Sequence, residues 1–114
     1  MTTSNHLRMH RKQGALSQAE IGELLGLPYQ YDVSRYERGV RSPRIPTLIA
    51  AELLFGENCC DLFPGLSRGI AEEMLRRVRG LRQKLGGHRD AVAMTKRRYL
   101  LVIARRLEQR LQSL

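Results

Sequence analysis

Hydrogen-bonding side chains gather in the stretch YQYDVSRYERGVRSPR, which covers residues 29–44. The stretch is too polar for a protein core and too regularly patterned for a linker. A helix over its first part would carry an amide, a phenol, a hydroxyl and a guanidinium group on one face, from Gln30, Tyr31, Ser34 and Arg35. These groups donate and accept hydrogen bonds, so the chemistry that they offer is recognition of a polar surface.

No set of side chains has the spacing of a catalytic or metal centre. Cys59 and Cys60 are adjacent, and a disulfide between neighbours would strain the peptide and close almost no loop, so both are expected as reduced thiols. His6 and His10 are four residues apart, but two ligands do not complete a structural metal site. A nucleophile–base pair, a carboxylate pair and a glycine-rich phosphate loop are also missing. The sequence therefore predicts no enzyme, no metal and no cofactor.

Charge divides the chain into two halves. The net charge of +9 and the isoelectric point of about 10.6 favour a polyanionic partner. Residues 1–65 contain seven Lys or Arg and seven Asp or Glu, whereas residues 66–114 contain thirteen and four. No stretch is long and apolar enough to span a bilayer, and the start, MTTSNHLRMHRK, lacks the apolar run of a secretory signal. We therefore expect a cytoplasmic protein without a membrane partner.

The first half has the pattern of several short helices. The expected helices cover residues 5–13, 17–25, 30–38 and 47–55, and a last turn over residues 58–63 begins at Asn58 as its cap. Ser17 and Glu20 of SQAE form a capping box, and Gly26 gives the backbone freedom that a tight turn requires. The third helix would turn Val33 and Tyr36 inward. No segment alternates with a period of two residues, so no strand is expected.

Four motifs follow one another along this half: LSQAEIGELLGL, VSRYERG, SPR and DLF. Together they resemble the helix-turn-helix domain of Cro/C1-type (Xre-like) DNA-binding regulators over residues 6–64. The resemblance implies an all-α fold in which residues 1–65 form a five-helix, lambda-repressor-like helix-turn-helix domain. It also implies that Glu37 pairs with Arg11 of the first helix. Gly22 is the small residue expected where two helices cross.

The chain departs from the family pattern at three places. One extra residue lies between Gly26 and Val33, directly before the third helix. His10 stands where the family more often has an aliphatic residue, and Glu52 stands where it usually has a small one. The extra residue affects the assignment of base-reading positions, whereas the fold is expected to accommodate it.

In this family the third helix lies in the major groove of double-stranded DNA. The resemblance implies that Gln30, Tyr31 and Arg35 read bases, and that Ser34 contacts a base or a phosphate. This suits the side chains, because Gln can bond adenine and Arg can bond guanine with two hydrogen bonds each.

The resemblance also implies contacts to the DNA backbone or the minor groove. The side chains implied in these contacts are Gln18, Tyr29, Arg38, Arg41 and Arg44. Gln18 is expected near the start of a helix, where backbone amides attract phosphate. Tyr29 and Tyr31 leave an alternative open, in which one of them fills space over Leu27 and Pro28.

The second half has the pattern of a hairpin. Apolar residues recur every three or four positions through residues 67–85 and again through residues 90–112, with GGH at 86–88 between them. A hairpin with one apolar face cannot bury that face alone, so it must pack on the N-terminal domain, on a second copy or on another protein. Among these, residues 66–114 are expected to self-associate, for example as a four-helix bundle. The residues expected in the dimer contact are Ile70, Met74, Val78, Leu81, Leu100, Ile103 and Leu107.

These observations predict a sequence-specific transcriptional regulator, such as a repressor, that acts as a dimer on a pseudo-palindromic operator. The sequence does not distinguish a repressor from an activator. The alternative is an antitoxin or anti-activator, whose basic hairpin binds an acidic protein partner while the helix-turn-helix domain regulates its own promoter. Both interpretations require double-stranded DNA as a partner.

Overall fold

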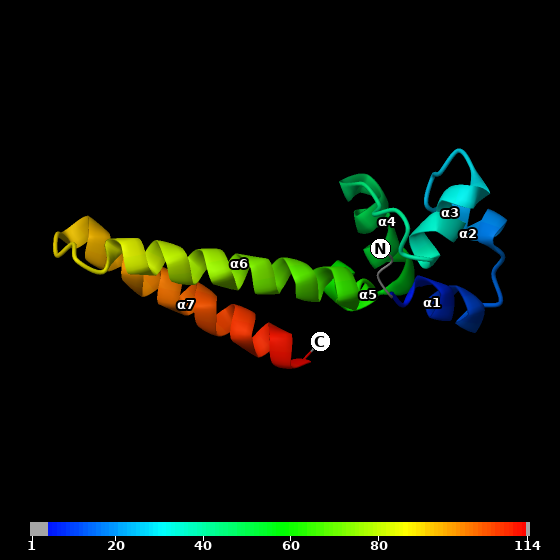
Figure 1. Cartoon of the computed structure of the whole chain (residues 1–114). Coiled ribbons are helices and arrows are strands. Elements are labelled where there is room, and N and C mark those ends of the chain that lie inside the picture. Colours follow the sequence, from blue (N-terminus) through cyan, green and yellow to red (C-terminus); the bar gives the residue numbers. More distant parts are fainter. Residues whose placement is uncertain (1–4, 114) are drawn as a thin grey trace. The chain divides into compact units, whose positions relative to one another are not determined.

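The computed structural model describes residues 5–113, in which every regular element is a helix (Figure 1). The helices are α1 (Leu7–Gln13), α2 (Gln18–Leu24), α3 (Gln30–Glu37), α4 (Ile45–Phe55), α5 (Cys59–Leu62), α6 (Pro64–Leu85) and α7 (Ala91–Ser113). The predicted all-α fold is confirmed. The chain forms two compact units that meet between Ser67 and Arg68, within α6. Residues 1–4 and 114, at the outer ends of the two expected regions, lie outside the described part.

Local signals set both ends of α2. The Ser17 hydroxyl accepts a hydrogen bond from the Glu20 amide at 3.0 Å, and the Glu20 carboxylate accepts one from the Ser17 amide at 2.9 Å, so the predicted capping box is present. After α2, Gly26 has a φ of +73°, in the left-handed region. This conformation lets the Leu27 amide donate to the Gly22 carbonyl at 2.8 Å. The chain therefore leaves α2 by a tight turn.

Three helix starts differ from the predicted ones by two or three residues. α1 begins at Leu7, after Asn5. The Asn5 side chain accepts a hydrogen bond from the Leu7 amide at 3.1 Å and donates one to the Tyr36 carbonyl at 2.7 Å. α4 and α6 begin two and three residues earlier than predicted. Pro46 and Pro64 lie in their first turns, where the missing amide proton would have no helical partner in any case.

Glu52 and His10, two residues that depart from the family pattern, have polar partners in the fold. Glu52 accepts a hydrogen bond from the Cys59 amide at 2.7 Å and so caps α5, whereas the side chain of Asn58 makes no cap, contrary to the prediction. His10 lies 2.8 Å from a carboxylate oxygen of Glu57. Cys59 is a free thiol, and burial raises its pKa.

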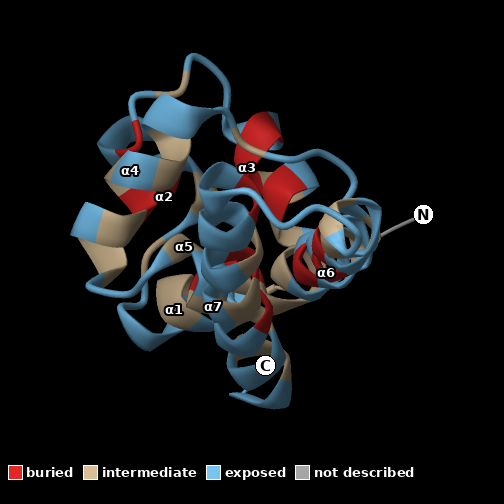
Figure 2. Ribbon diagram, turned by 90° about the vertical axis from the view of Figure 1, so that its left-hand side faces the viewer, coloured by how far each residue is buried: buried red, intermediate tan, exposed pale blue. Residues whose placement is uncertain are grey.

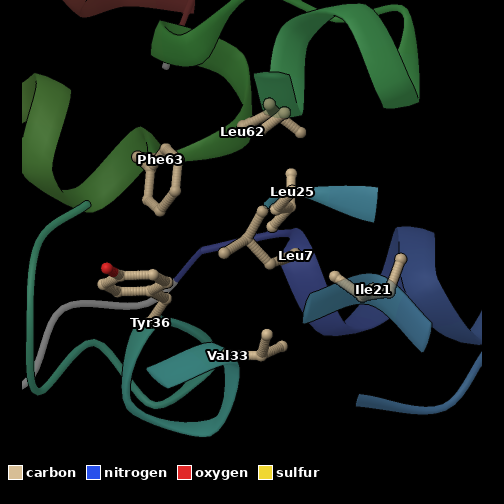
Figure 3. Packing of buried hydrophobic residues seen from close by; sticks show 8 residues of the cluster. Leu7, Ile21, Leu25, Val33, Tyr36, Leu62 and Phe63 are labelled. Carbon is tan, nitrogen blue, oxygen red and sulfur yellow. The ribbon is translucent and has the colours of Figure 1, made fainter. Parts of the chain in front are cut away.

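The five helices α1, α2, α3, α4 and α5 share one hydrophobic core. Its buried side chains, most of which Figure 3 shows converging, are Leu7, Ile21, Leu25, Val33, Tyr36, Ala51, Leu62 and Phe63. Val33 and Tyr36 are 1% and 4% exposed, which confirms the predicted inward side of α3; the buried part of this helix is red in Figure 2. Because this side anchors α3 in the core, the opposite side is left to solvent.

The second unit is an α6–α7 hairpin with a small core of its own. The buried residues of this core are Leu75, Val78, Leu100 and Ala104. Arg97 of α7 donates hydrogen bonds to the carbonyls of Leu85, at the end of α6, and of His88, in the connecting turn. The Asp90 carboxylate accepts from the Ala93 amide at 2.9 Å, caps α7, and has its pKa lowered by that bond. Within residues 5–113, no helix has both the length and the apolar character needed to cross a membrane.

Candidate nucleic-acid interface

α3 presents its polar side to solvent. Gln30, Tyr31 and Arg35 are exposed, and Ser34 is half-buried. The fold therefore brings the four side chains that were predicted to read bases onto one helix, on the sides that the core does not use. The N-cap residue of α3 is Tyr29, whose backbone is extended.

α2 holds α3 in this position at a close crossing. A Cβ atom at Gly22 would lie 3.5 Å from Cγ2 of Val33 and 3.7 Å from Cα of Gln30. These are ordinary contact distances for one carbon, so the position has room for a methyl group and for little more. The predicted need for a small residue at this crossing is confirmed.

The exposed side chains of α3 also contact one another. The rings of Tyr29 and Tyr31 stack with centroids 5.1 Å apart, and Cζ of Arg35 lies 4.9 Å from the Tyr31 centroid. Asp32, which is largely buried, lies 3.7 Å from the Arg35 guanidinium and 3.4 Å from that of Arg41. Sequence reasoning missed Asp32, although its position three residues before Arg35 was a usable signal.

A hollow beside α3 collects five of the predicted DNA-contacting residues. Tyr29, Tyr31, Arg35, Arg41 and Arg44 all line it, from the start of α3 to the start of α4. Leu27 and Pro28 line the same hollow, so the two tyrosines lie near these residues and still remain about half exposed. Three guanidinium groups thus surround one concave surface, together with three phenols, the third from Tyr36, and the carboxylate of Asp32.

On the other flank of α3, Glu37 pairs with Arg11 as predicted. Nε and one terminal nitrogen of Arg11 donate to the two carboxylate oxygens at 2.6 and 3.1 Å. The side chains are 12% and 4% exposed, so this is a mostly buried bidentate pair and not a surface contact. The hydrogen bond to Glu37 raises the pKa of Arg11. Gln18, predicted to face a phosphate, donates to the same carboxylate at 3.2 Å.

A second hollow lies over this pair. Gln18, Ser34 and Arg38 line it together with Arg8 of α1. Arg38 also donates to the Ser34 carbonyl at 3.3 Å. Sequence reasoning missed Arg8, an exposed cation one turn before Arg11 on the same helix.

The residues that were predicted to form the dimer contact separate into two groups. Val78 and Leu100 are buried in the core of the hairpin, with Ile103 and Leu107 packed against them, so these four stabilise the hairpin itself. The exposed group is Ile70, Met74 and Leu81, which are 54%, 43% and 48% exposed.

A polar helix that is fixed by its other side across a tight turn, and is flanked by arginines, is the arrangement of a helix-turn-helix DNA-binding domain. Residues 7–62 match the sequence model of a helix-turn-helix family of the Cro/C1 (Xre-like) type, and the chain belongs to this family through that domain. It is therefore a DNA-binding transcription regulator, from a family that is not enzymatic. No curated protein and no solved structure matches the chain significantly.

Proposed function

We propose that the chain recognises a specific operator sequence by inserting α3 into the major groove of DNA. The observation that carries this proposal is the exposed set of Gln30, Tyr31 and Arg35 on a helix that the core holds from behind. The amide of Gln30 suits adenine and the guanidinium of Arg35 suits guanine. Tyr31 offers its ring to a thymine methyl group or its hydroxyl to a phosphate.

The position of Arg35 supports its role as the main reading residue. The Tyr31 ring lies against its guanidinium and Asp32 lies beside it. A side chain that is already restrained loses less conformational freedom when it binds, so more of its hydrogen-bond energy remains for affinity. Asp32 also partly balances the charge of Arg35. A group that offers negative charge without suitable hydrogen-bond acceptors therefore gains less from contact with Arg35.

Cations on both flanks of α3 support contacts to the phosphate backbone. Arg41 and Arg44 line one hollow, while Arg8 and Arg38 line the other. Such contacts position the domain on the duplex without reading sequence. Because each neutralised phosphate releases counterions, we expect log K to fall by about 0.9 per phosphate for each tenfold rise in salt.

We further propose that two copies bind a pseudo-palindromic operator, with the two α3 helices about 34 Å apart. An exposed stripe on α4 supports self-association of this domain. Ile45, Ile49 and Leu53 are 72%, 53% and 82% exposed and follow one another at four-residue steps. The stripe itself has no charged member, and residues 1–65 are balanced in charge, so two copies can approach without repulsion.

Selection of bound fragments from random duplex DNA tests this proposal, because a dimer selects two inverted half-sites. Arg35→Ala should then weaken binding to the selected operator by about 1–3 kcal/mol and leave non-specific binding nearly unchanged. Arg38→Ala is the matched control, and it should weaken binding to all sequences alike. If Arg35→Ala weakens binding to all DNA sequences equally, Arg35 contacts the DNA backbone and does not read a base. A selected motif without symmetry would refute the dimer.

A second candidate function is that of an antitoxin or anti-activator, in which the hairpin binds an acidic protein partner. The specific observation that favours it is the charge of the hairpin, where thirteen Lys or Arg accompany four Asp or Glu after residue 65. Both candidates use the same DNA-reading domain and differ only in what the hairpin does. Co-purification of a second chain with the full-length protein would distinguish them.

A further inference from the structure

A stripe along α6 is solvent-exposed and contains only apolar and basic side chains. Ile70, Met74, Arg77, Leu81 and Lys84 follow one another at alternating steps of four and three residues, the spacing of one helix face. All five are exposed, whereas Leu75 and Val78 of the same helix are buried in the hairpin core.

A matching stripe runs along α7. Its members, at the same alternating steps, are Val92, Lys96, Tyr99, Ile103, Arg106 and Arg110, of which Ile103 is half-buried against the hairpin core. Val92 and Tyr99 are 62% and 60% exposed, which is unusual for two large apolar side chains on one face. This stripe also contains no acidic residue.

The two stripes lie on the same face of the hairpin. Arg79 of α6 and Glu108 of α7 contact each other at 3.4 Å, so they mark one side of the seam between the helices. On α6 the stripe lies on the other side of the buried residue Val78 from Arg79, and on α7 it lies on the other side of Ala104 from Glu108. We call the surface formed by the two stripes the hairpin face.

The acidic residues of this unit all have partners, and only Glu73 pairs with a member of the hairpin face, Arg77. Glu72 contacts Arg68, Glu73 contacts Arg76 and Arg77, Glu108 contacts Arg79, and Asp90 caps α7. In contrast, Lys84, Lys96 and Arg106 have no ion-pair partner among the described residues. The hairpin face therefore combines exposed apolar side chains with uncompensated positive charge.

This charge pattern selects among the possible occupants. A second copy would place the same cations opposite each other, and like charges across an interface are unfavourable. DNA would satisfy the cations but would leave Ile70, Met74 and Val92 in water. An acidic protein helix with one apolar side satisfies both kinds of side chain, as in other helix-in-groove complexes.

We propose that the hairpin face binds an acidic amphipathic helix of another protein. Ile70, Met74 and Leu81 bury the apolar side of that helix, while its carboxylates meet Lys84 and Lys96. The α6 stripe spans about 21 Å at 1.5 Å per residue, so the partner helix needs about four turns. This inference rests on the second candidate function, whose acidic partner it specifies as an amphipathic helix, and it does not depend on which operator the first unit reads.

The test measures fluorescence anisotropy of a labelled synthetic peptide of about 18 residues, with Leu at helical i, i+3, i+4, i+7 spacing and Glu at most other positions. The full-length chain should bind this peptide more tightly than a scrambled peptide of the same composition. Met74→Ser should weaken the binding at least about tenfold. Met94→Ser is the matched control: Met94 is 47% exposed, close to the 43% of Met74, and lies on the opposite face, so its effect should stay within about twofold.

A charge-matched pair isolates the electrostatic contribution. Lys96→Glu on the hairpin face should weaken peptide binding several-fold more than Arg98→Glu, which makes the same change in charge sign on the far side of α7. Leu81→Ser should reproduce the effect of Met74→Ser, and far-UV circular dichroism should show unchanged helix content for both.

Four results would each overturn the proposal. The scrambled peptide could bind as tightly as the amphipathic one, or the two methionine variants could have equal effects. Met74→Ser could dissociate a dimer in sedimentation equilibrium, which would make a second copy the occupant. Met74→Ser could instead weaken binding to duplex DNA, which would make DNA the occupant. Arg35→Ala should leave peptide affinity unchanged, so failure of the operator proposal has a separate readout.

Discussion

Glu37 is the side chain whose removal tests the architecture of the DNA-reading domain most directly. Its carboxylate accepts two hydrogen bonds from Arg11, at 2.6 and 3.1 Å, and a third from Gln18 at 3.2 Å. These bonds connect α3 to α1 and α2. In Glu37→Ala the Arg11 guanidinium keeps its bond to the Leu16 carbonyl but loses the carboxylate that balances its charge.

The expected cost follows from burial of this pair. Removing one partner of a buried ion pair costs about 3–5 kcal/mol, because the remaining charge stays buried without a counterion. Arg11 is still 12% exposed, so water compensates in part and we expect a value of about 3 kcal/mol. A domain of this size has a total stability of only about 3–9 kcal/mol, so the loss is a large fraction of it.

The measurement is urea unfolding of the full chain, followed by tyrosine fluorescence. Tyr29, Tyr31 and Tyr36 belong to the first unit and Tyr99 to the second, so the signal reports mainly on the DNA-reading domain. Glu57→Ala is the matched control. Its carboxylate also contacts a basic side chain on α1, but it is 42% exposed, and its removal should cost less than about 1 kcal/mol.

A double variant separates loss of a buried charge pair from loss of packing. Arg11→Met combined with Glu37→Met replaces both charges by apolar groups and should return the free energy of unfolding to within about 1 kcal/mol of the unmodified chain. If Glu37→Ala costs no more than Glu57→Ala, the pair does not behave as a buried one, and this reasoning about the domain is wrong.

Three further changes test other contacts. Asp32→Ala removes the carboxylate beside Arg35 and Arg41, so non-specific DNA binding should tighten while the ratio of operator to non-specific affinity falls; an unchanged ratio in anisotropy titrations would show that Asp32 does not orient Arg35. The lowered pKa of Asp90 means that its ionised cap adds stability above about pH 4, which is lost as the pH falls through the folded-state pKa. Asp90→Asn should therefore show a shallower loss of stability in acid unfolding, and an identical slope would contradict this. The buried Nε of Arg82 has no hydrogen-bond partner among the described residues, so Arg82→Met should raise the free energy of unfolding by about 1 kcal/mol, whereas a decrease would show that the guanidinium stabilises the hairpin.

The helices and their stops were predictable because the signals are local. The capping box of Ser17 and Glu20 and the inward pair Val33 and Tyr36 depend only on neighbours along one helix. The starts of α4 and α6 were misplaced because a proline can either precede a helix or occupy its first turn, and the sequence pattern alone does not separate these cases. The cap of α5 was misassigned because the carboxylate that accepts from its first amide belongs to Glu52, on another helix.

At the candidate site, the sequence identified the exposed residues of α3, but it could not give the contacts between them. Asp32 lies one helical turn before Arg35, but its contact with Arg41 forms only when the loop after α3 folds back. Gln18 was assigned to a phosphate from its place at a helix start, whereas in the fold its amide donates to Glu37. Such contacts depend on the crossing of helices that are distant in the chain.

What the sequence determined by itself is the all-helical pattern, the family of the first domain and the concentration of positive charge in the second half, because each depends on residue type and spacing alone. The tertiary structure decided which apolar residues of the hairpin are buried between its two helices. Val78 and Leu100 lie in its core, while Ile70 and Met74 remain exposed. Residues on one amphipathic helix become distinguishable only when a neighbouring helix covers part of the apolar stripe, and that depends on how two helices pack.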